Sequence, residues 1–175
     1  MADFENELRA TIRDVPDFPK PGILFKDITP VLANPRLFER VTREMAQPFA
    51  NERITHVVAI ESRGFILGGP IAQTLKAGLV PVRKPGKLPS KTASIEYALE
   101  YGTGRLEIHS DACGPEARVL IVDDVLATGG TAAAAAQLVQ GCGAPIVGYS
   151  FLMGLSFLNG VARLPAGRVV QLLTY

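Results

Sequence analysis

The stretch that decides the fold is Val119-Leu120-Ile121-Val122-Asp123-Asp124-Val125-Leu126-Ala127-Thr128-Gly129-Gly130-Thr131. Its first four residues are apolar without alternation, which predicts a strand buried on both faces, as in a parallel sheet covered by helices. The strand ends in two acids, and a loop of small and hydroxyl residues leads into an Ala-rich helix over 131–140. Because ligands of such sheets bind beyond the carboxyl ends of the strands, this strand end is a candidate site.

Working outward, strands and helices alternate along the chain. Apolar, β-branched segments predict strands at 54–60, 79–82, 118–123 and 145–153, and a helix is expected at 64–76. This alternation predicts an α/β fold with a doubly wound parallel sheet.

Two segments depart from that alternation. At the N-terminus the helical spacing of Phe4, Leu8, Ile12 and Val15 predicts a short helix, which the prolines and glycine of 18–22 end. An extended segment follows at 23–28, and a helix begins at Asn34-Pro35. The polar stretch over 83–109 predicts a hairpin outside the central sheet, with strands at 94–101 and 105–109 and a turn at Gly102-Thr103-Gly104.

Composition excludes several classes of protein. The chain has 175 residues, which suggests one domain, and 47% of them are hydrophobic, which excludes a disordered chain. With 18 Lys and Arg against 17 Asp and Glu, it lacks the basic excess that a general nucleic-acid binder needs. The region 125–162 is uncharged, but glycines and Pro145 divide it into pieces too short to span a membrane. We therefore expect neither a nucleic-acid partner nor a membrane partner.

The loop after the two acids has the chemistry of an anion site. Backbone N–H groups of 127–131 can converge on a phosphate at the helix N-terminus, and Gly129 and Gly130 allow it to approach closely. Thr128 and Thr131 add hydroxyl donors. Two carboxylates would repel a phosphate, so Asp123 and Asp124 indicate hydroxyls or a metal held beside it. A ribose 5-phosphate satisfies both requirements.

The segment from Asp123 to Thr131 resembles the phosphoribosyl-diphosphate motif of type I phosphoribosyltransferases. Other segments, in order along nearly the whole chain, are similar to the adenine branch of that family. They are Phe18 to Pro30, Glu61-Ser62-Arg63-Gly64-Phe65, Pro81 to Pro89, Leu99-Glu100-Tyr101-Gly102 and the terminal Leu172-Leu173-Thr174-Tyr175.

The resemblance implies a type I phosphoribosyltransferase-like fold in a single domain over 1–175, with a small N-terminal hood at 1–33 and a mobile catalytic flap at 83–104. It implies that adenine and 5-phosphoribosyl 1-diphosphate give AMP and diphosphate in purine salvage, with Mg²⁺ as cofactor. The metal would be held mainly through substrate and water near Asp123 and Asp124, without direct protein ligands. A homodimer is also implied, while two cysteines without a disulfide framework indicate a reducing compartment, expected to be the cytoplasm.

Residue roles follow from the same resemblance. Asp123 and Asp124 would bind the ribose hydroxyls, and the 5-phosphate would be held by Ala127, Thr128, Gly129, Gly130 and Thr131. The catalytic residues would be Arg63, which contacts the diphosphate from a turn with a cis peptide at Glu61–Ser62, Lys84, and Glu100 as the proton-transfer group. The flap would bring Arg83, Lys84, Lys87 and Lys91 to the diphosphate and exclude water, with Tyr101 beside the substrate.

For the base, the resemblance points to a backbone edge at Leu24, Phe25 and Lys26, with Phe25 stacking on adenine and Leu155 closing the other side. The family usually has Arg where Lys26 stands, and its eukaryotic members often have Glu where Gly154 stands. The change at Lys26 matters if the contact is made through the guanidinium and is mild if it is made through the backbone, whereas the side-chain role at Gly154 is absent here.

Two alternatives remain at this point. A phosphoribosyltransferase for 6-oxopurines is disfavoured, because such enzymes resemble one another in a Lys that the strand at 145–153 lacks. A phosphoribosyl-diphosphate-sensing regulator that binds nucleic acid would need a basic face or an added domain, and a net charge of +1 argues against both.

Overall fold

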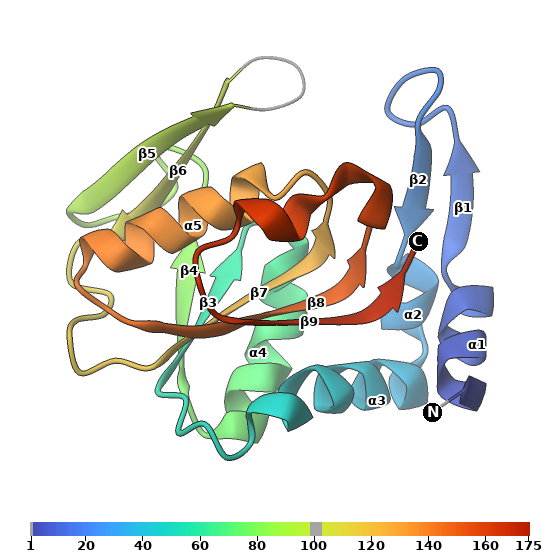
Figure 1. Cartoon of the computed structure of the whole chain (residues 1–175), viewed down its shortest axis with the longest axis horizontal. Coiled ribbons are helices and arrows are strands. Elements are labelled where there is room, and N and C mark those ends of the chain that lie inside the picture. Colours follow the sequence, from blue (N-terminus) through green and yellow to red (C-terminus); the bar gives the residue numbers. More distant parts are fainter. Residues whose placement is uncertain (1, 99–102) are drawn as a thin grey trace. The chain divides into compact units, whose positions relative to one another are not determined.

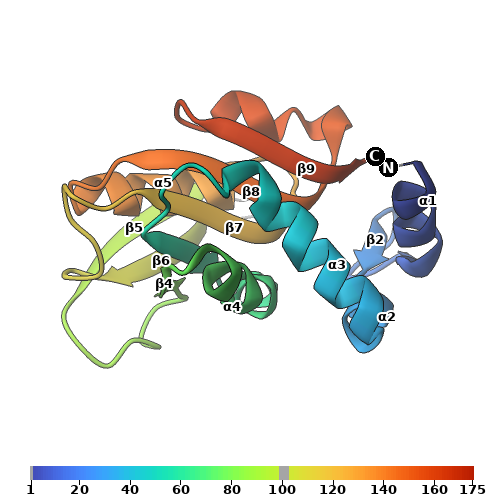
Figure 2. The same cartoon turned by 90° about the horizontal axis from the view of Figure 1, so that it is seen from below.

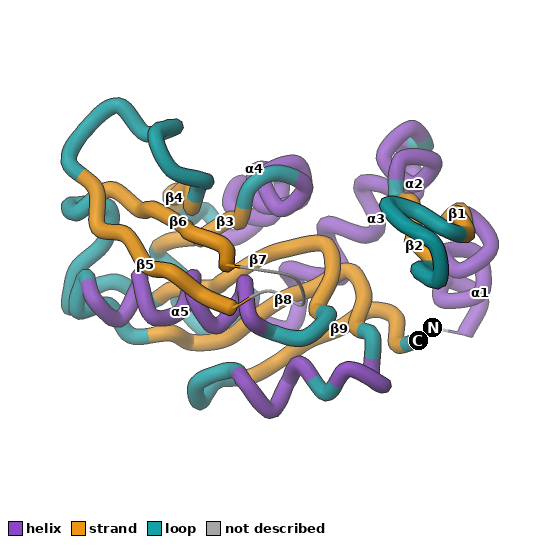
Figure 3. Tube along the Cα trace, turned by 90° about the horizontal axis from the view of Figure 1, so that it is seen from above, coloured by secondary structure: helices purple, strands orange, loops and turns teal. Residues whose placement is uncertain are grey.

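In the computed structural model, which describes residues 2–98 and 103–175, five strands form a parallel sheet in the order β4-β3-β7-β8-β9 (Figure 1). They are β3 (His56–Ile60), β4 (Gly78–Val82), β7 (Val119–Leu126), β8 (Ile146–Gly154) and β9 (Arg168–Thr174). The helices α4 (Arg63–Leu75) and α5 (Gly130–Gly141) lie on opposite faces of the sheet (Figure 2, Figure 3). The predicted doubly wound parallel α/β fold is confirmed.

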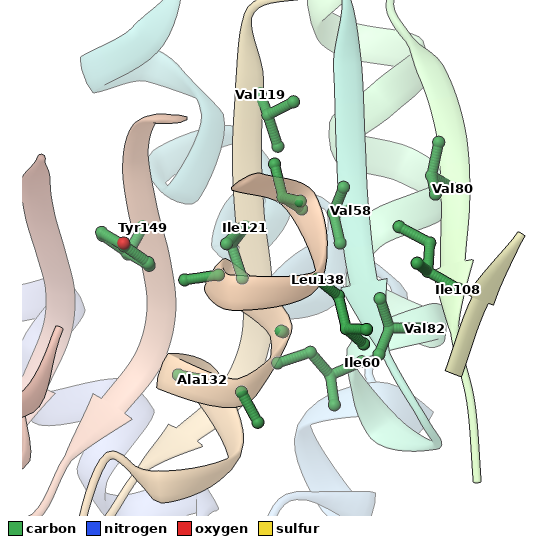
Figure 4. Close-up of a cluster of buried hydrophobic side chains, with 14 of the residues drawn as sticks. Val58, Ile60, Val80, Val82, Ile108, Val119, Ile121, Ala132, Leu138 and Tyr149 are labelled. Carbon is green, nitrogen blue, oxygen red and sulfur yellow. The ribbon is translucent and has the colours of Figure 1, made fainter. Parts of the chain in front are cut away.

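Successive side chains of each central strand point to opposite faces of the sheet. Val58 and Ile60 of β3 and Ile121 of β7 belong to a buried cluster that includes Leu138 of α5 (Figure 4). On the opposite face α4 lies so close that a Cβ at Gly68 would stand 2.7 Å from the Cβ of Ala59. Because both faces are buried, these strands show no polar alternation in the sequence.

The structure corrects the predicted elements next to the site. Strand β7 runs to Leu126 rather than ending at Asp123, so both acids are strand residues. Helix α5 begins at Gly130, one residue before the predicted start. The edge strand β9 was not among the predicted strands.

The predicted hairpin is present as β5 (Thr92–Ala98) and β6 (Thr103–His109), which form a separate antiparallel two-stranded sheet. The predicted turn at Gly102-Thr103-Gly104 is wrong for two of its residues, because Thr103 pairs with Ala98 and Gly104 pairs with Tyr97. Short 3-10 helices occur elsewhere in the chain: η1 (Gln47–Phe49) precedes β3, and η2 (Ser156–Leu158) and η3 (Gly160–Arg163) lie between β8 and β9.

The described residues divide into two units, 1–41 and 42–175, and the sheet belongs to the second. The first unit contains α1 (Ala2–Thr11), β1 (Arg13–Pro16), β2 (Leu24–Asp27) and α2 (Thr29–Ala33), and α3 (Pro35–Ala46) starts within it. Val15 was predicted on the first helix but lies in β1, paired with Phe25 of β2. The single domain over 1–175 and the hood at 1–33 stay predictions. Within the described part of the chain, no helix has the length and apolar character to cross a membrane.

Candidate active site

Three neighbouring strands end at the same edge of the sheet. Strands β4, β3 and β7 are adjacent and parallel, so the residues that follow them gather at one place. Arg83 and Lys84 follow β4, the turn 61–63 follows β3, and Asp123 and Asp124 lie at the end of β7. Sequence positions about 20 to 60 residues apart are therefore brought to one edge by the sheet topology.

The acid pair has one buried and one partly buried member, and it is paired with an arginine. Asp124 is only 2% exposed, and its Oδ2 lies 2.9 Å from Nε of Arg63. This ion pair lacks the alignment of a hydrogen bond, and within the described residues Oδ2 makes none. Asp123 is partly buried, and its Oδ1 accepts a hydrogen bond of 2.9 Å from the backbone N–H of Asp124. Oδ2 of Asp124 is thus enclosed beside the Arg63 guanidinium.

The surroundings of the two carboxyl groups disfavour their charged forms. Burial raises the pKa of Asp123 well above its usual range, and the charge of Asp124 raises that pKa further. Burial also raises the pKa of Asp124, although the guanidinium of Arg63 opposes the change. Burying two charged carboxylates costs folding free energy, and such a cost is typical of a site organised for ligand binding rather than for stability.

We expect Asp123→Asn to stabilise the fold while it weakens ligand binding. The Asn oxygen can still accept the Asp124 N–H, while the buried charge is gone. Because the folded-state pKa is raised, the wild type loses stability as pH rises from the unfolded value near 3.8 through the higher folded value. The variant should therefore have a higher free energy of unfolding than the wild type at pH 7. Denaturant unfolding from pH 4 to 8 checks this, and a less stable variant at pH 7 would contradict it.

The turn after β3 fits closely against the end of β7. The peptide between Glu61 and Ser62 is cis, as the sequence predicted. A Cβ at Gly64 would lie 2.9 Å from the carbonyl oxygen of Val122 and 3.0 Å from Oδ1 of Asp123. Only glycine permits this approach, which lets Arg63 at the start of α4 reach the acid pair.

The loop from Ala127 to Gly130 is supported from behind by η3. Gly129 has a φ of +80°, and a Cβ there would collide with the carbonyl oxygen of Gly160. A Cβ at Gly160 would in turn collide with the carbonyl oxygen of Ala127 and lie 3.0 Å from the amide nitrogen of Gly129. Sequence reasoning missed Gly160, because a glycine in an irregular segment carries no local signal of this contact.

The start of α5 also has neighbours from the hairpin and from η3. The hydroxyl of Thr131 lies 3.5 Å from that of Tyr97, and a Cβ at Gly130 would lie 3.1 Å from the carbonyl oxygen of Ala98. Nη1 of Arg163 would lie 3.5 Å from the same Cβ. Glu100 and Tyr101, predicted at the site, lie outside the described residues.

The first part of the predicted flap is anchored to the body of the unit. Nε of Arg83 donates to Oε2 of Glu61 over 3.2 Å, and its Nη1 donates to the carbonyl oxygen of Lys87 over 2.9 Å. The backbone N–H of Gly86 donates to Oε2 of Glu107 over 3.0 Å. Neither glutamate was assigned a role from the sequence, because their partners lie about 20 residues away. The side chains of Lys84, Lys87 and Lys91 are exposed, and flap motion stays a prediction.

The predicted base-binding residues occur in both units. In the larger unit Leu155 follows β8, and its N–H donates to the carbonyl oxygen of Leu126 over 2.9 Å. In the smaller unit Leu24, Phe25 and Lys26 form most of β2. Lys26 is paired with Asp14 of β1 at 2.6 Å, and the ring of Phe25 packs edge-on against that of Phe18. The Lys26 ammonium is therefore engaged within its own unit.

The carboxylate oxygens of this site fit a metal ion that arrives bound to substrate better than a metal ion that the protein alone would hold. Within residues 2–98 and 103–175, no group of three or more His, Cys, Asp or Glu side chains could hold a metal ion. Asp123 and Asp124 together offer hard carboxylate oxygens, one of them without a hydrogen bond. Two such oxygens suit Mg²⁺ that keeps water and substrate oxygens as its other ligands.

Comparison with known proteins identifies the family. A model described as the phosphoribosyl transferase domain matches residues 27–155. The chain is 58% identical to an adenine phosphoribosyltransferase of Myxococcus xanthus (strain DK1622), over 97% of this chain and 92% of that protein. The chain belongs to the adenine phosphoribosyltransferase family.

Solved structures of this family agree with the fold. The crystal structure of adenine phosphoribosyltransferase from Rhodothermus marinus DSM 4252 is 53% identical, covers 100% of both chains and gives a TM-score of 0.95. The enzyme of Saccharomyces cerevisiae, complexed with an imino-altritol bisphosphate and adenine, is 41% identical, with a TM-score of 0.92 over 99% of this chain and 100% of that one. The type I phosphoribosyltransferase fold implied by the sequence is thereby confirmed.

Proposed function

We propose that the protein transfers the phosphoribosyl group of 5-phosphoribosyl 1-diphosphate to adenine in purine salvage, forming AMP and diphosphate. The observation that carries the proposal is the convergence at one sheet edge of a buried acid pair, a glycine-rich helix start and several cations. Each matches one part of the phosphoribosyl substrate. Family membership supports the choice of adenine, and the yeast relative was crystallised with that base.

The ribose and its 5-phosphate would bind at the end of β7. Asp123 and Asp124 would accept hydrogen bonds from the two ribose hydroxyls. The phosphate would lie against the backbone N–H groups and hydroxyls of Ala127, Thr128, Gly129, Gly130 and Thr131. The positive end of the α5 dipole favours an anion at this position.

The diphosphate would lie beside Arg63, with Arg83, Lys84 and Lys87 contributing from the segment after β4. When the bond from the ribose carbon to diphosphate breaks, negative charge grows on the leaving group. Cations that are already in place stabilise this charge without reorganising. Arg63 and Lys84 are therefore proposed as catalytic residues. Lys91 would join the closed flap, which excludes water.

Mg²⁺ is proposed as the cofactor, bound through substrate oxygens and water near Asp123 and Asp124. When bound, it would neutralise part of the diphosphate charge. The protein's own contribution there is to hold the ribose hydroxyls and to keep Arg63 beside Asp124 before the substrate arrives.

For adenine, we propose the backbone of Leu24, Phe25 and Lys26 as the polar edge, with Phe25 and Leu155 contacting the ring. Glu100 would take the proton from the imidazole part of the base, and Tyr101 would lie beside the substrate. An extended backbone segment offers both a donor and an acceptor, which suits N1 and the 6-amino group of adenine.

The assembly is proposed on family grounds, and the location is proposed from the cysteine content, which indicates a reducing compartment. We infer a cytoplasmic homodimer without nucleic-acid or membrane partners. Light scattering after size-exclusion chromatography should give a mass of about twice 18.7 kDa. A monomeric mass at micromolar concentration would contradict the dimer.

The reaction is tested by incubating the protein with adenine, 5-phosphoribosyl 1-diphosphate and Mg²⁺ and by quantifying both products. AMP and diphosphate should appear in equal amounts. Diphosphate without AMP would indicate hydrolysis, and the absence of both would contradict the proposed function.

A further inference from the structure

Glu61 has a partly buried carboxylate to which the proposed reaction assigns no role. It is the first residue after β3 and stands two residues before Arg63. Its side chain is 14% exposed, and its backbone N–H donates to the carbonyl oxygen of Val82 over 2.9 Å. A negative charge close to a diphosphate site repels the ligand, so its presence there needs a physical reason.

The contacts of Glu61 provide that reason. Its Oε2 accepts two hydrogen bonds, from Nε of Arg83 over 3.2 Å and from the backbone N–H of Lys84 over 3.0 Å. One oxygen thus fixes a guanidinium and the backbone of the neighbouring lysine. The same residue is joined through Ser62 to Arg63, so it links the turn after β3 to the segment after β4.

The far side of this segment is fixed independently. The backbones of Arg83 and Glu107 exchange hydrogen bonds of 2.9 and 2.8 Å, and Oε2 of Glu107 accepts the N–H of Gly86. The carbonyl oxygen of Lys87 accepts a hydrogen bond from Nη1 of Arg83. Among the described residues, Arg83 is thus held through Nε and Nη1, while its Nη2 makes no hydrogen bond and remains for a ligand.

We infer that Glu61 is a positioning residue for the diphosphate end of the site. It holds Arg83 and the backbone of Lys84 at a fixed place relative to Arg63, so the leaving group meets a preorganised set of cations. The inference rests on the proposed function, since it assigns Glu61 to the diphosphate that this reaction releases. An ordinary exposed ion pair would contribute about 0–1 kcal/mol to stability and nothing to ligand binding.

Two substitutions separate position from charge. Because both donors share Oε2, the amide oxygen of Glu61→Gln can accept both hydrogen bonds without a charge. Glu61→Ala removes the acceptor altogether. A matched control is Glu52→Ala, which deletes a carboxylate paired with Arg118 at 3.6 Å before the amino ends of β3 and β7.

The experiment is calorimetric titration of each variant with Mg²⁺-diphosphate and, separately, with ribose 5-phosphate. Glu61→Ala should bind diphosphate about tenfold or more weakly, because its cations are no longer held in position. Its affinity for ribose 5-phosphate should stay within about twofold of wild type, as should both affinities of Glu52→Ala. Glu61→Gln should keep diphosphate affinity within about threefold. In steady state, Glu61→Ala should raise the KM for 5-phosphoribosyl 1-diphosphate, and Glu61→Gln should restore it.

Four results would overturn the inference. Unchanged diphosphate binding by Glu61→Ala would show that Glu61 positions nothing. An equal loss for ribose 5-phosphate would show a general structural role. A defect in Glu61→Gln as large as that of the alanine variant would show that charge, not position, matters. A wild-type protein that binds neither ligand would overturn the proposed function, and this inference with it.

Discussion

Glu100→Gln should lower turnover by about 100- to 10,000-fold, the usual value of general acid–base catalysis, while the KM for 5-phosphoribosyl 1-diphosphate changes little. The amide keeps the size of the side chain but cannot take a proton from the base. An interaction made only in the transition state appears in kcat rather than in KM. Single-turnover kinetics with saturating substrates isolates this step.

Glu96→Gln is the matched control for this experiment. Glu96 is an exposed carboxylate on β5, four residues earlier in the chain, and its neutralisation should leave turnover at the wild-type value. If Glu100→Gln shows a wild-type chemical step with weaker substrate binding, then Glu100 anchors the flap and transfers no proton.

Gly160→Ala should lower the affinity for 5-phosphoribosyl 1-diphosphate by about 100-fold, although Gly160 itself is not proposed to contact substrate. The new methyl group would collide with the carbonyl oxygen of Ala127 and press on the amide of Gly129. Both neighbours are backbone atoms of the phosphate loop, so the loop must move, and a shift of about 1 Å is enough for a loss of this size.

The control is Gly69→Ala on α4, where a Cβ would meet nothing within 4 Å. Alanine is the better helix former, so this variant should be at least as stable as wild type and should bind substrate normally. Calorimetric titration with 5-phosphoribosyl 1-diphosphate compares the two. Wild-type affinity in Gly160→Ala would show that the loop tolerates displacement and does not hold the 5-phosphate as proposed.

The central sheet could be predicted because its strands are buried on both faces and therefore have unbroken apolar runs, as in Val119 to Val122. Strand β9 differs: it lies at the sheet edge, only Leu173 is fully buried, and Arg168 and Gln171 interrupt its apolar residues. Val15 matched the helical spacing but pairs in β1, because α1 ends at Thr11 and the next residues pair with β2. Tertiary pairing overrode the local pattern there.

In the site, too, some features could be predicted from the sequence and others could not. Asp123, Asp124 and the glycines before α5 are contiguous, so their pattern is visible in the sequence and predicts a phosphate with hydroxyls. The contacts of Glu61 with Arg83 and of Gly160 with Ala127 join residues 22 and 33 positions apart. Nothing in the local sequence encodes such contacts, since they depend on which strands become neighbours.

The central proposal is that this site makes AMP from adenine. Its most direct test compares the specificity constants for adenine and hypoxanthine at saturating 5-phosphoribosyl 1-diphosphate. A site built to pair the 6-amino group leaves a buried polar group unpaired when it is offered a 6-oxo base. We predict a preference for adenine of about 10,000-fold or more, whereas similar specificity constants for the two bases would contradict the claim.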